Sequence, residues 1–260
     1  LRTHVIPKIG HHPIDQIDQH KLKQVLAPIW HTSASTAAKA LSRFNLTLKH
    51  AIALGIDVDI QAASKARALL GKQRHQVVHI PSVPYQEMPS FYRWLKGKEI
   101  QAALALRFLI LTVARTSEVR LATFDELEDD IWVLAPERTK TGREHRVPLT
   151  NEALDILKET RRRSPNEFVF PTLKDKPMSD AAMATFLKRE GIEARPHGFR
   201  ASFRTWVEEQ TDTPFEVKET ALGHTVDSKI VQAYQRSDRL EKRRTLMERW
   251  EWFLIKKHSR

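Results

Sequence analysis

Apolar residues in the first part of the chain recur at steps of three and four, the spacing of one face of an α-helix. Over residues 34–56 this stripe consists of Ala37, Ala40, Leu41, Phe44, Leu48 and Ala51. We expect Ser35 or Thr36 to cap the start of this helix and Gly55 to close it in the left-handed conformation. A shorter helix is expected over residues 19–29. The chain should therefore begin with a small helical module.

Beyond residue 84 the pattern mixes helical and alternating segments. Residues 90–114 predict two helices, the second almost entirely apolar and therefore buried. Residues 130–135 and 143–149 read as two strands joined by a basic, turn-rich segment, and residues 167–171 as a further short strand. Two more helices are expected at 150–163 and 178–191, with Thr150 and Ser179 as caps and Gly191 as the stop. The remainder reads as mostly helical, so the predicted fold class is mainly α with a small antiparallel β-sheet (α+β).

The intervening segment, residues 71–84, lacks helical period and contains two prolines. Proline restricts the backbone and cannot continue a helix or a central strand. We therefore expect a helical domain at 1–70, a basic linker at 71–84 and a larger domain at 85–260.

The net charge of the chain indicates what kind of partner it binds. The 260 residues hold 43 Lys and Arg against 32 Asp and Glu, a net charge of +11. Residues 1–75 carry 11 basic and 4 acidic side chains, which is +7 of that excess. Such an imbalance is typical of proteins that bind a polyanion, with a basic protein that binds no nucleic acid as the alternative.

Composition also excludes several classes. The chain has no cysteine, which excludes disulfides, thiolate metal sites and a thiol nucleophile. The apolar run from Ala102 to Ala114 is interrupted by Arg107 and is too short to span a bilayer. No secretory signal is evident at the start, and the first residue, Leu1, suggests a piece of a longer protein. We expect a soluble protein of the bacterial cytoplasm, associated with the nucleoid and not with a membrane.

Two groups of polar residues have the chemistry of anion binding. Arg115 stands at the end of the buried helix, with Glu118 three residues on as an ion-pair partner. His197 and Arg200 share one face near a predicted helix start, with Pro196 suited to its first turn. Taken singly, each group is more often structural than functional.

Two further groups of polar residues also have the chemistry of anion binding. Lys140 is predicted at the tip of the hairpin, beside Gly142, pointing away from the core. The sequence Leu-Gly-His ends at His224, ten residues before Tyr234, which is followed by many basic residues. A tyrosine among cations suits contact with a phosphate better than a place in the core.

In this order and spacing, the four groups resemble the tyrosine recombinases of the phage integrase family. The segment AYQRSDRLEKRRTLMERWEWFL is similar to the satellite-phage and genomic-island subgroup. The resemblance implies a core-site DNA-binding domain at 1–70 and a catalytic domain at 85–260, without the subgroup's N-terminal arm-binding domain. Departures are Ala114, where the family has a glycine, and Phe199-Arg200-Ala201-Ser202 in place of Leu-Arg-Arg-Thr. The implied catalytic residues are Arg115, Lys140, His197, Arg200, His224 and Tyr234.

The resemblance also implies the reaction. Tyr234 would attack a DNA phosphodiester, giving a 3′-phosphotyrosyl bond and a free 5′-hydroxyl. Arg115 and Arg200 would bind the non-bridging oxygens, and His224 would donate to one of them. His197 would accept the phenol proton or brace the phosphate, and Lys140 would protonate the leaving 5′ oxygen. The scheme needs no cofactor, neither a metal nor ATP.

Partners follow from the same resemblance. We expect double-stranded DNA at core attachment sites, a homotetramer on DNA, a monomer when free, and accessory DNA-bending and directionality factors. The tail around Trp250 and Leu254 could pack on its own domain or dock on a neighbouring subunit, with docking slightly favoured. The alternatives are a type IB-like topoisomerase and a DNA-binding protein without catalysis. The expected DNA-contacting residues are Lys39, Arg43, Lys72, Arg74 and Arg143. Near the tyrosine, the residues available for DNA or partner contacts are Arg236, Arg239, Lys242, Arg243 and Arg244.

Overall fold

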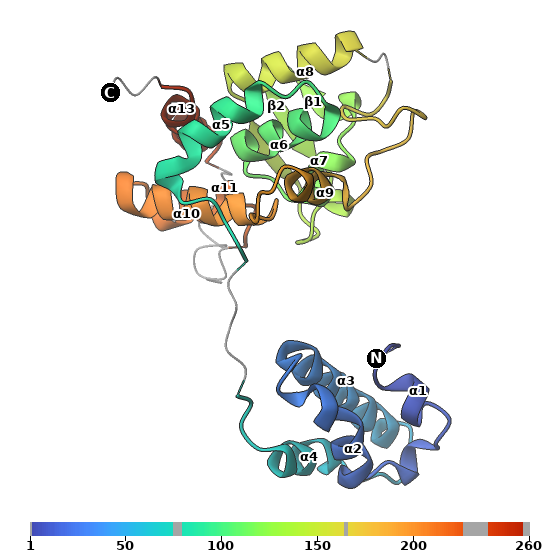
Figure 1. Cartoon of the computed structure of the whole chain (residues 1–260). Helices are drawn as coiled ribbons and strands as arrows, with labels where there is room; N and C mark the ends of the chain where they lie inside the picture. Colours follow the sequence, from blue (N-terminus) through green and yellow to red (C-terminus); the bar gives the residue numbers. More distant parts are fainter. Residues whose placement is uncertain (1, 75–79, 164–165, 226–238, 257–260) are drawn as a thin grey trace. The chain divides into compact units, whose positions relative to one another are not determined.

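The computed structural model describes residues 2–74, 80–163, 166–225 and 239–256 (Figure 1). The chain divides into two compact units, Leu1–His79 and Ile80–Arg260. Each unit has a hydrophobic core of its own. The described residues are mainly helical with one small antiparallel sheet, which confirms the predicted fold class.

The first unit is built from four helices: α1 (Ile6–Ile9), α2 (Gln19–Trp30), α3 (Ala34–Ala53) and α4 (Ala62–Leu70). All six residues of the predicted stripe on α3 are buried, and α2 lies where it was expected. Gly55 adopts the left-handed conformation (φ +79°), as predicted. The predicted cap was wrong: Ser35 and Thr36 lie inside α3, because the helix begins one residue earlier, at Ala34.

Both described ends of segment 71–84 are hydrogen-bonded to the unit beside them. At the first end, Trp30 Nε1 donates to the Gly71 carbonyl (2.9 Å) and the Arg74 N–H donates to His31 Nδ1 (3.2 Å). At the second end, the Pro81 carbonyl accepts the Arg195 N–H at 2.9 Å. Residues 71–74 are thereby attached to the first unit, and residue 81 to the second.

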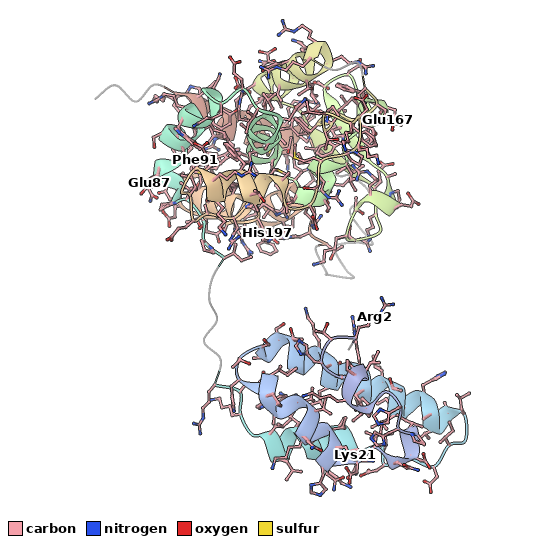
Figure 2. All side chains as sticks on the ribbon, turned by 45° about the vertical axis from the view of Figure 1, so that its right-hand side comes forward. Arg2, Lys21, Glu87, Phe91, Glu167 and His197 are labelled. Carbon is pink, nitrogen blue, oxygen red and sulfur yellow. The ribbon has the colours of Figure 1, made fainter. Side chains whose placement is uncertain are left out.

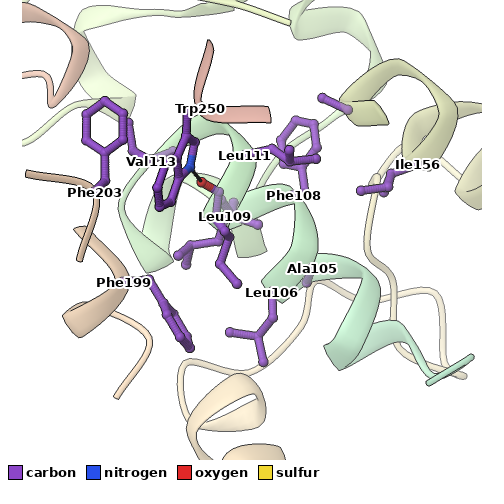
Figure 3. Close-up of a cluster of buried hydrophobic side chains, with 14 of the residues drawn as sticks. Ala105, Leu106, Phe108, Leu109, Leu111, Val113, Ile156, Phe199, Phe203 and Trp250 are labelled. Atoms are coloured by element: carbon purple, nitrogen blue, oxygen red, sulfur yellow. Dashed lines mark hydrogen bonds between the residues drawn. The ribbon is translucent and has the colours of Figure 1, made fainter. Parts of the chain in front are cut away.

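Helix α6 (Gln101–Thr112) is the centre of the second unit (Figure 1). Ten of its twelve residues are buried, as its apolar sequence predicted. The Trp250 indole donates to the Ile110 carbonyl at 2.9 Å and so joins α6 to the last helix (Figure 3). The helices packed around α6 are α5 (Met88–Lys96), α7 (Thr116–Arg120), α8 (Asn151–Arg163), α9 (Ala182–Arg189) and α13 (Leu240–Ile255).

The sheet contains β1 (Leu127–Glu128), β2 (Ile131–Leu134) and β3 (His145–Pro148) in that order, all antiparallel. The hairpin of β2 and β3 was predicted, whereas β1 was not. A strand over residues 167–171 was predicted wrongly. That segment makes only isolated bridges, Thr123 with Phe168 and Pro171 with Pro177, because its backbone runs along no partner strand.

Two predicted helix caps are also absent. The Thr150 hydroxyl is buried without a hydrogen-bond partner, and α9 begins at Ala182, three residues after Ser179. Gly191 closes α9 in the left-handed conformation (φ +72°), as predicted. The other helices among the described residues of this unit are α10 (Gly198–Gln210) and α11 (Phe215–Ala221). Short 3₁₀ turns lie at Ile14–Gln16, Tyr85–Glu87, Phe124–Glu126 and Pro136–Arg138.

The last helix packs on its own unit. Trp250 and Leu254 are buried in the core of the second unit, contrary to the favoured docking on a neighbour, while Trp252 is 58% exposed. The aromatic neighbours Phe203 and Trp206 on α10 fill the space around Trp250. None of the helices described is both long enough and apolar enough to cross a membrane.

Candidate active site

Arg115 is positioned at the junction of α6 and α7. Helix α6 ends at Val113, a β-branched residue with φ +47°, and the chain then extends to place Arg115 at the start of α7. The Glu118 carboxylate accepts both the Arg115 backbone N–H (2.6 Å) and its Nη1 (2.7 Å). This confirms the predicted Arg115–Glu118 ion pair. The other guanidinium nitrogen, Nη2, donates to the Gly223 carbonyl at 2.7 Å.

Arg200 lies in the first turn of α10 and is only 5% exposed. Its Nη1 donates to the Val113 carbonyl, and its Nη2 donates to the Leu222 carbonyl at 2.5 Å. Burial, followed by repulsion from Arg115, lowers the pKa of Arg200 to about 10. The guanidinium therefore remains charged at neutral pH. The two arginines bind successive carbonyls of the loop that follows α11.

That loop is the Leu-Gly-His segment, and its geometry explains its sequence. The His224 N–H donates to the Glu219 carbonyl (2.9 Å) and the Gly223 N–H to the Thr220 carbonyl (2.9 Å), the paired bonds of a Schellman helix end. Gly223 takes the left-handed conformation that this motif requires (φ +60°). A β-carbon there would also lie 3.2 Å from Arg115 Nη1. The glycine thus allows the helix end and the arginine to approach each other.

The ring of His224 is held at both nitrogens. Nδ1 lies 2.7 Å from Glu219 Oε2, and Nε2 lies 3.3 Å from Arg200 Nη2. Glu219 is buried and belongs to α11, whereas His224 is exposed on its other side. The hydrogen bonds of Arg115, Arg200 and His224 therefore join α7, α10 and the end of α11 into one cationic cluster.

His197 and Lys140 lie beside this cluster. His197 immediately precedes α10, with its ring on the surface of the second unit (Figure 2). Partial burial, then the positive charges of Arg200 and Arg115, lower the pKa of His197, and Lys140 contributes a smaller effect of the same sign. Lys140 is exposed in the turn between β2 and β3, as predicted. Helix α10 begins at Gly198, so Pro196 lies outside its first turn, contrary to the prediction.

His145 belongs to the site and was not singled out from the sequence. It is the first residue of β3, and a β-carbon at Gly223 would lie 3.4 Å from its Nε2. Burial, then the charges of Arg243, Arg115 and Arg200, lower the pKa of His145 to about 3. The alternation of the strand contained the evidence: His145 is two residues from the buried Val147, so both share the inward face.

The other residues predicted to take part in catalysis or DNA contact lie outside the cationic cluster or outside the described residues. Tyr234 falls in 226–238, outside the described residues. Arg243 is buried and donates to the Arg146 carbonyl, and Arg244 donates to Asp130 at 2.7 Å, so neither is an open surface cation as expected. Arg143 is exposed in the same turn as Lys140. The exposed predicted residues of the first unit are Lys39, Arg43, Lys72 and Arg74.

Acidic side chains and histidines do not gather as a metal site in the described ranges, where no group of three or more could hold an ion. The carboxylates closest to the cluster, Glu118 and Glu219, are each already paired with a cation or an imidazole. The chemistry of the described site therefore resides in guanidinium and imidazole groups.

Comparisons with known proteins agree with this architecture. The phage integrase family profile matches residues 82–241, and the phage integrase central domain profile matches residues 1–67. The fold of the chain is similar to that of solved integrases. A λ integrase (75–356) dimer bound to a COC′ core site superposes with a TM-score of 0.66 at 18% identity, covering 86% of this chain and 85% of that one. The Tn1549 transposon integrase in complex with circular intermediate DNA gives 0.63 at 16% identity, covering 88% and 85%.

The chain belongs to the phage integrase family. It is 31% identical to prophage integrase IntZ of Escherichia coli K12 over 95% of its length, and 28% identical to prophage integrase IntA of the same strain over 96%. It is 27% identical to the integrase of Enterobacteria phage P4 over 98% of its length. The chain spans 62% of the length of IntZ and IntA and 63% of the P4 protein.

Proposed function

We propose that this chain contains the core-binding and catalytic parts of a site-specific DNA recombinase. The observation that carries the proposal is the environment of Arg200. A buried charge needs a partner of opposite sign. Arg107, which is 7% exposed, has one in Glu152 at 2.7 Å. Arg200 is as deeply buried, yet among the described residues its hydrogen-bond partners are two carbonyls and an imidazole.

Glu118 and Glu219 favour the charged form of Arg200, but neither carboxylate forms a described ion pair with it. An anion that enters the site would supply a counter-charge in direct contact. Arg115 and Arg200 both present planar guanidinium groups, whose fork of donors matches the oxygens of a phosphate. His224 and Lys140 both lower the pKa of His197, and Arg200 Nη2 lies 3.3 Å from His224 Nε2, so these groups lie close to one another. A phosphodiester of the DNA backbone fits this arrangement better than a carboxylate, because several donors converge from different elements.

In the proposed reaction, the Tyr234 hydroxyl attacks the phosphorus and the 5′ oxygen leaves. The proton of the hydroxyl passes to His197, whose lowered pKa leaves the ring free to accept it at neutral pH. Arg115 and Arg200 stabilise the charge that grows on the non-bridging oxygens, an effect of about 3–4 kcal/mol for each well-placed donor. Lys140 donates a proton to the leaving oxygen, a contribution of about 10²–10⁴-fold.

The relatives support the wider proposal. Curated relatives are named integrases, and one solved neighbour is a λ integrase tetramer bound to a Holliday junction, at a TM-score of 0.64 and 17% identity. By analogy, the partner is double-stranded DNA at core attachment sites, and four copies assemble on two sites. We further propose residues 1–70 as the core-site-binding domain, 71–84 as the linker and 85–260 as the catalytic domain, with accessory DNA-bending and directionality factors in the bacterial cytoplasm.

A covalent trapping experiment tests the nucleophile. A nicked duplex with the junction sequence of the mobile element that encodes the chain should form a protease-sensitive DNA adduct with the wild type. Tyr234→Phe should bind the same duplex with similar affinity and form no adduct, because it lacks the attacking oxygen. Tyr92→Phe is the matched control, since Tyr92 is buried beside Glu152, and it should still form the adduct.

Two results would overturn the proposal. An adduct with Tyr234→Phe would assign the nucleophile to another residue. Relaxation of supercoiled DNA without strand exchange between two attachment sites would assign the chain to the topoisomerases instead.

A further inference from the structure

Glu219 and His224 occupy the two positions of a Schellman helix end whose side chains usually make a hydrophobic contact. In this chain the contact is polar, with Nδ1 of the ring 2.7 Å from Oε2 of the carboxylate. The His224 N–H also donates to the Glu219 carbonyl (2.9 Å), so the same two residues are joined by a backbone and by a side-chain hydrogen bond. The end of α11 therefore fixes both the backbone and the side chain of residue 224 through one acidic residue.

The hydrogen bonds also define where the ring carries its proton. An arginine has only donors, so Arg200 Nη2 can only donate to His224 Nε2. With Nδ1 donating to the Glu219 carboxylate, Nε2 is the ring nitrogen that accepts from Arg200. The ring proton therefore lies on Nδ1. The resulting chain of donors runs from Arg200 through His224 to Glu219.

The surroundings of Glu219 favour its hydrogen bond with the His224 ring over other side-chain contacts. It is 8% exposed, and its other oxygen, Oε1, lies 3.2 Å from Arg204 Nη2 without the alignment of a hydrogen bond. Arg204 is half exposed, so solvent screens much of that ion pair. The aligned bond to His224 is therefore the strongest side-chain interaction of this carboxylate among the described residues.

We propose that Glu219 is a positioning residue, which orients the His224 ring so that Nε2 accepts from Arg200 and holds that guanidinium at the phosphate site. In this tautomer Nε2 has no proton to donate to a phosphate oxygen, so the ring acts through Arg200. This inference rests on the proposed function for its effect on cleavage, although the tautomer it assigns does not. The ring contacts Glu219 from α11 and Arg200 from α10, and His197 lies near enough for the two rings to interact electrostatically. Arg204 lies beside the other oxygen of Glu219. Without Glu219, the ring loses its only anionic contact among the described residues and is free to rotate.

Three variants separate the possibilities. Glu219→Gln keeps an oxygen that accepts the Nδ1 proton, whereas Glu219→Ala removes it. Glu216→Gln is the matched control, because Glu216 lies one turn earlier on α11 and its carboxylate has no hydrogen-bond partner among the described residues. Thermal unfolding and DNA affinity establish that each variant is folded.

The first measurement is the ¹⁵N spectrum of the histidine rings in the free protein, with His224 assigned from its absence in His224→Asn. We expect the Nδ1-protonated form in the wild type, in Glu216→Gln and in Glu219→Gln, and a mixture of tautomers in Glu219→Ala. An unchanged His224 spectrum in Glu219→Ala would overturn the inference, because the carboxylate would then not determine the tautomer.

The second measurement is the single-turnover cleavage rate at saturating DNA. We expect Glu219→Ala to cleave about 10²-fold more slowly, since small displacements of an active-site group have effects of this size. Glu219→Gln should recover at least a tenth of the wild-type rate. Equal rates in all folded variants would show that Glu219 positions nothing needed for cleavage. Failure of the wild type itself to cleave, with the tautomer as assigned, would reject the proposed function and leave the geometric assignment standing.

Discussion

His145 is a histidine that its surroundings keep neutral. The ring lies under the cluster of arginines, and burial and the charges of Arg243, Arg115 and Arg200 lower its pKa from 6.5 to about 3. An unfolded chain binds a proton at this residue below pH 6.5, but the folded chain does not until about pH 3. The histidine therefore has no effect on stability above pH 6.5, and it destabilises the fold progressively as the pH falls below that value.

This titration predicts a pH-dependent difference between the wild type and His145→Gln. Between pH 7.5 and pH 5.0 the wild type should lose about 2 kcal/mol of unfolding free energy that the variant does not lose. Urea unfolding followed by tryptophan fluorescence measures the difference, because five of the six tryptophans lie in the second unit. A stability difference between the two proteins that is the same at both pH values would contradict a His145 that stays neutral in the folded chain.

At the scale of elements, the segment before α5 is braced against the start of α10. The Pro81 carbonyl accepts the Arg195 N–H at 2.9 Å, and the Ser202 hydroxyl donates to the Val83 carbonyl at 2.5 Å. Gly198 makes this approach possible, since a β-carbon there would lie 2.3 Å from the Pro81 oxygen. The brace thus supports the start of α10, where His197 precedes the helix and Arg200 lies in its first turn.

Gly198→Ala should therefore destabilise the second unit by about 1–3 kcal/mol, because the added methyl group has no space. Displacement of the helix start should also reduce DNA cleavage more than DNA binding. Gly97→Ala is the control: Gly97 has a negative φ, and its added carbon would meet only the Trp94 carbonyl at 3.4 Å. Thermal unfolding and cleavage assays on both variants test the brace. Similar behaviour of the two variants would mean that the segment yields without effect on α10.

The elements also show what a sequence can predict. Apolar spacing located α3 because its burial repeats every three or four residues, and an almost entirely apolar sequence located α6, ten of whose twelve residues are buried. The alternation in β3 contained the evidence for an inward-facing His145, which was not singled out. The helix caps at Thr150 and Ser179 were predicted wrongly, because the Thr150 hydroxyl meets no hydrogen-bond partner and the backbone enters α9 three residues after Ser179. The cluster of Arg115, Arg200 and His224 could be named from spacing, but the carbonyls that bind the arginines depend on how α6, α10 and α11 pack together. Glu219 was missed for the same reason.

At the scale of the whole molecule, the positive charge is concentrated in the first unit. Residues 1–75 carry a net charge of +7, whereas the other 185 residues carry +4. Ten of the eleven basic side chains in this stretch are exposed. Lys65 pairs with Asp59, and it is the one Lys or Arg of residues 2–74 with a described ion pair. In the second unit, by contrast, ion pairs bind many of the cations, among them Arg107, Arg115 and Arg244.

If the chain binds DNA as proposed, the first unit should therefore dominate the salt dependence of binding. Each phosphate contact contributes about 0.9 to the slope of log affinity against log salt concentration. Replacing Lys39, Arg43, Lys72 and Arg74 together by glutamine should reduce that slope by up to about 3.6. Fluorescence anisotropy on the attachment-site duplex between 50 and 200 mM salt measures it.

The matched control removes the same four charges from the second unit, at the exposed residues Lys158, Arg162, Lys174 and Lys176. We expect this control to change the slope much less, since condensed counterions are released where the protein touches the phosphates and not in proportion to its net charge. An equal reduction by both sets would show that net charge alone governs binding, and the assignment of Lys39, Arg43, Lys72 and Arg74 as DNA contacts would then fail.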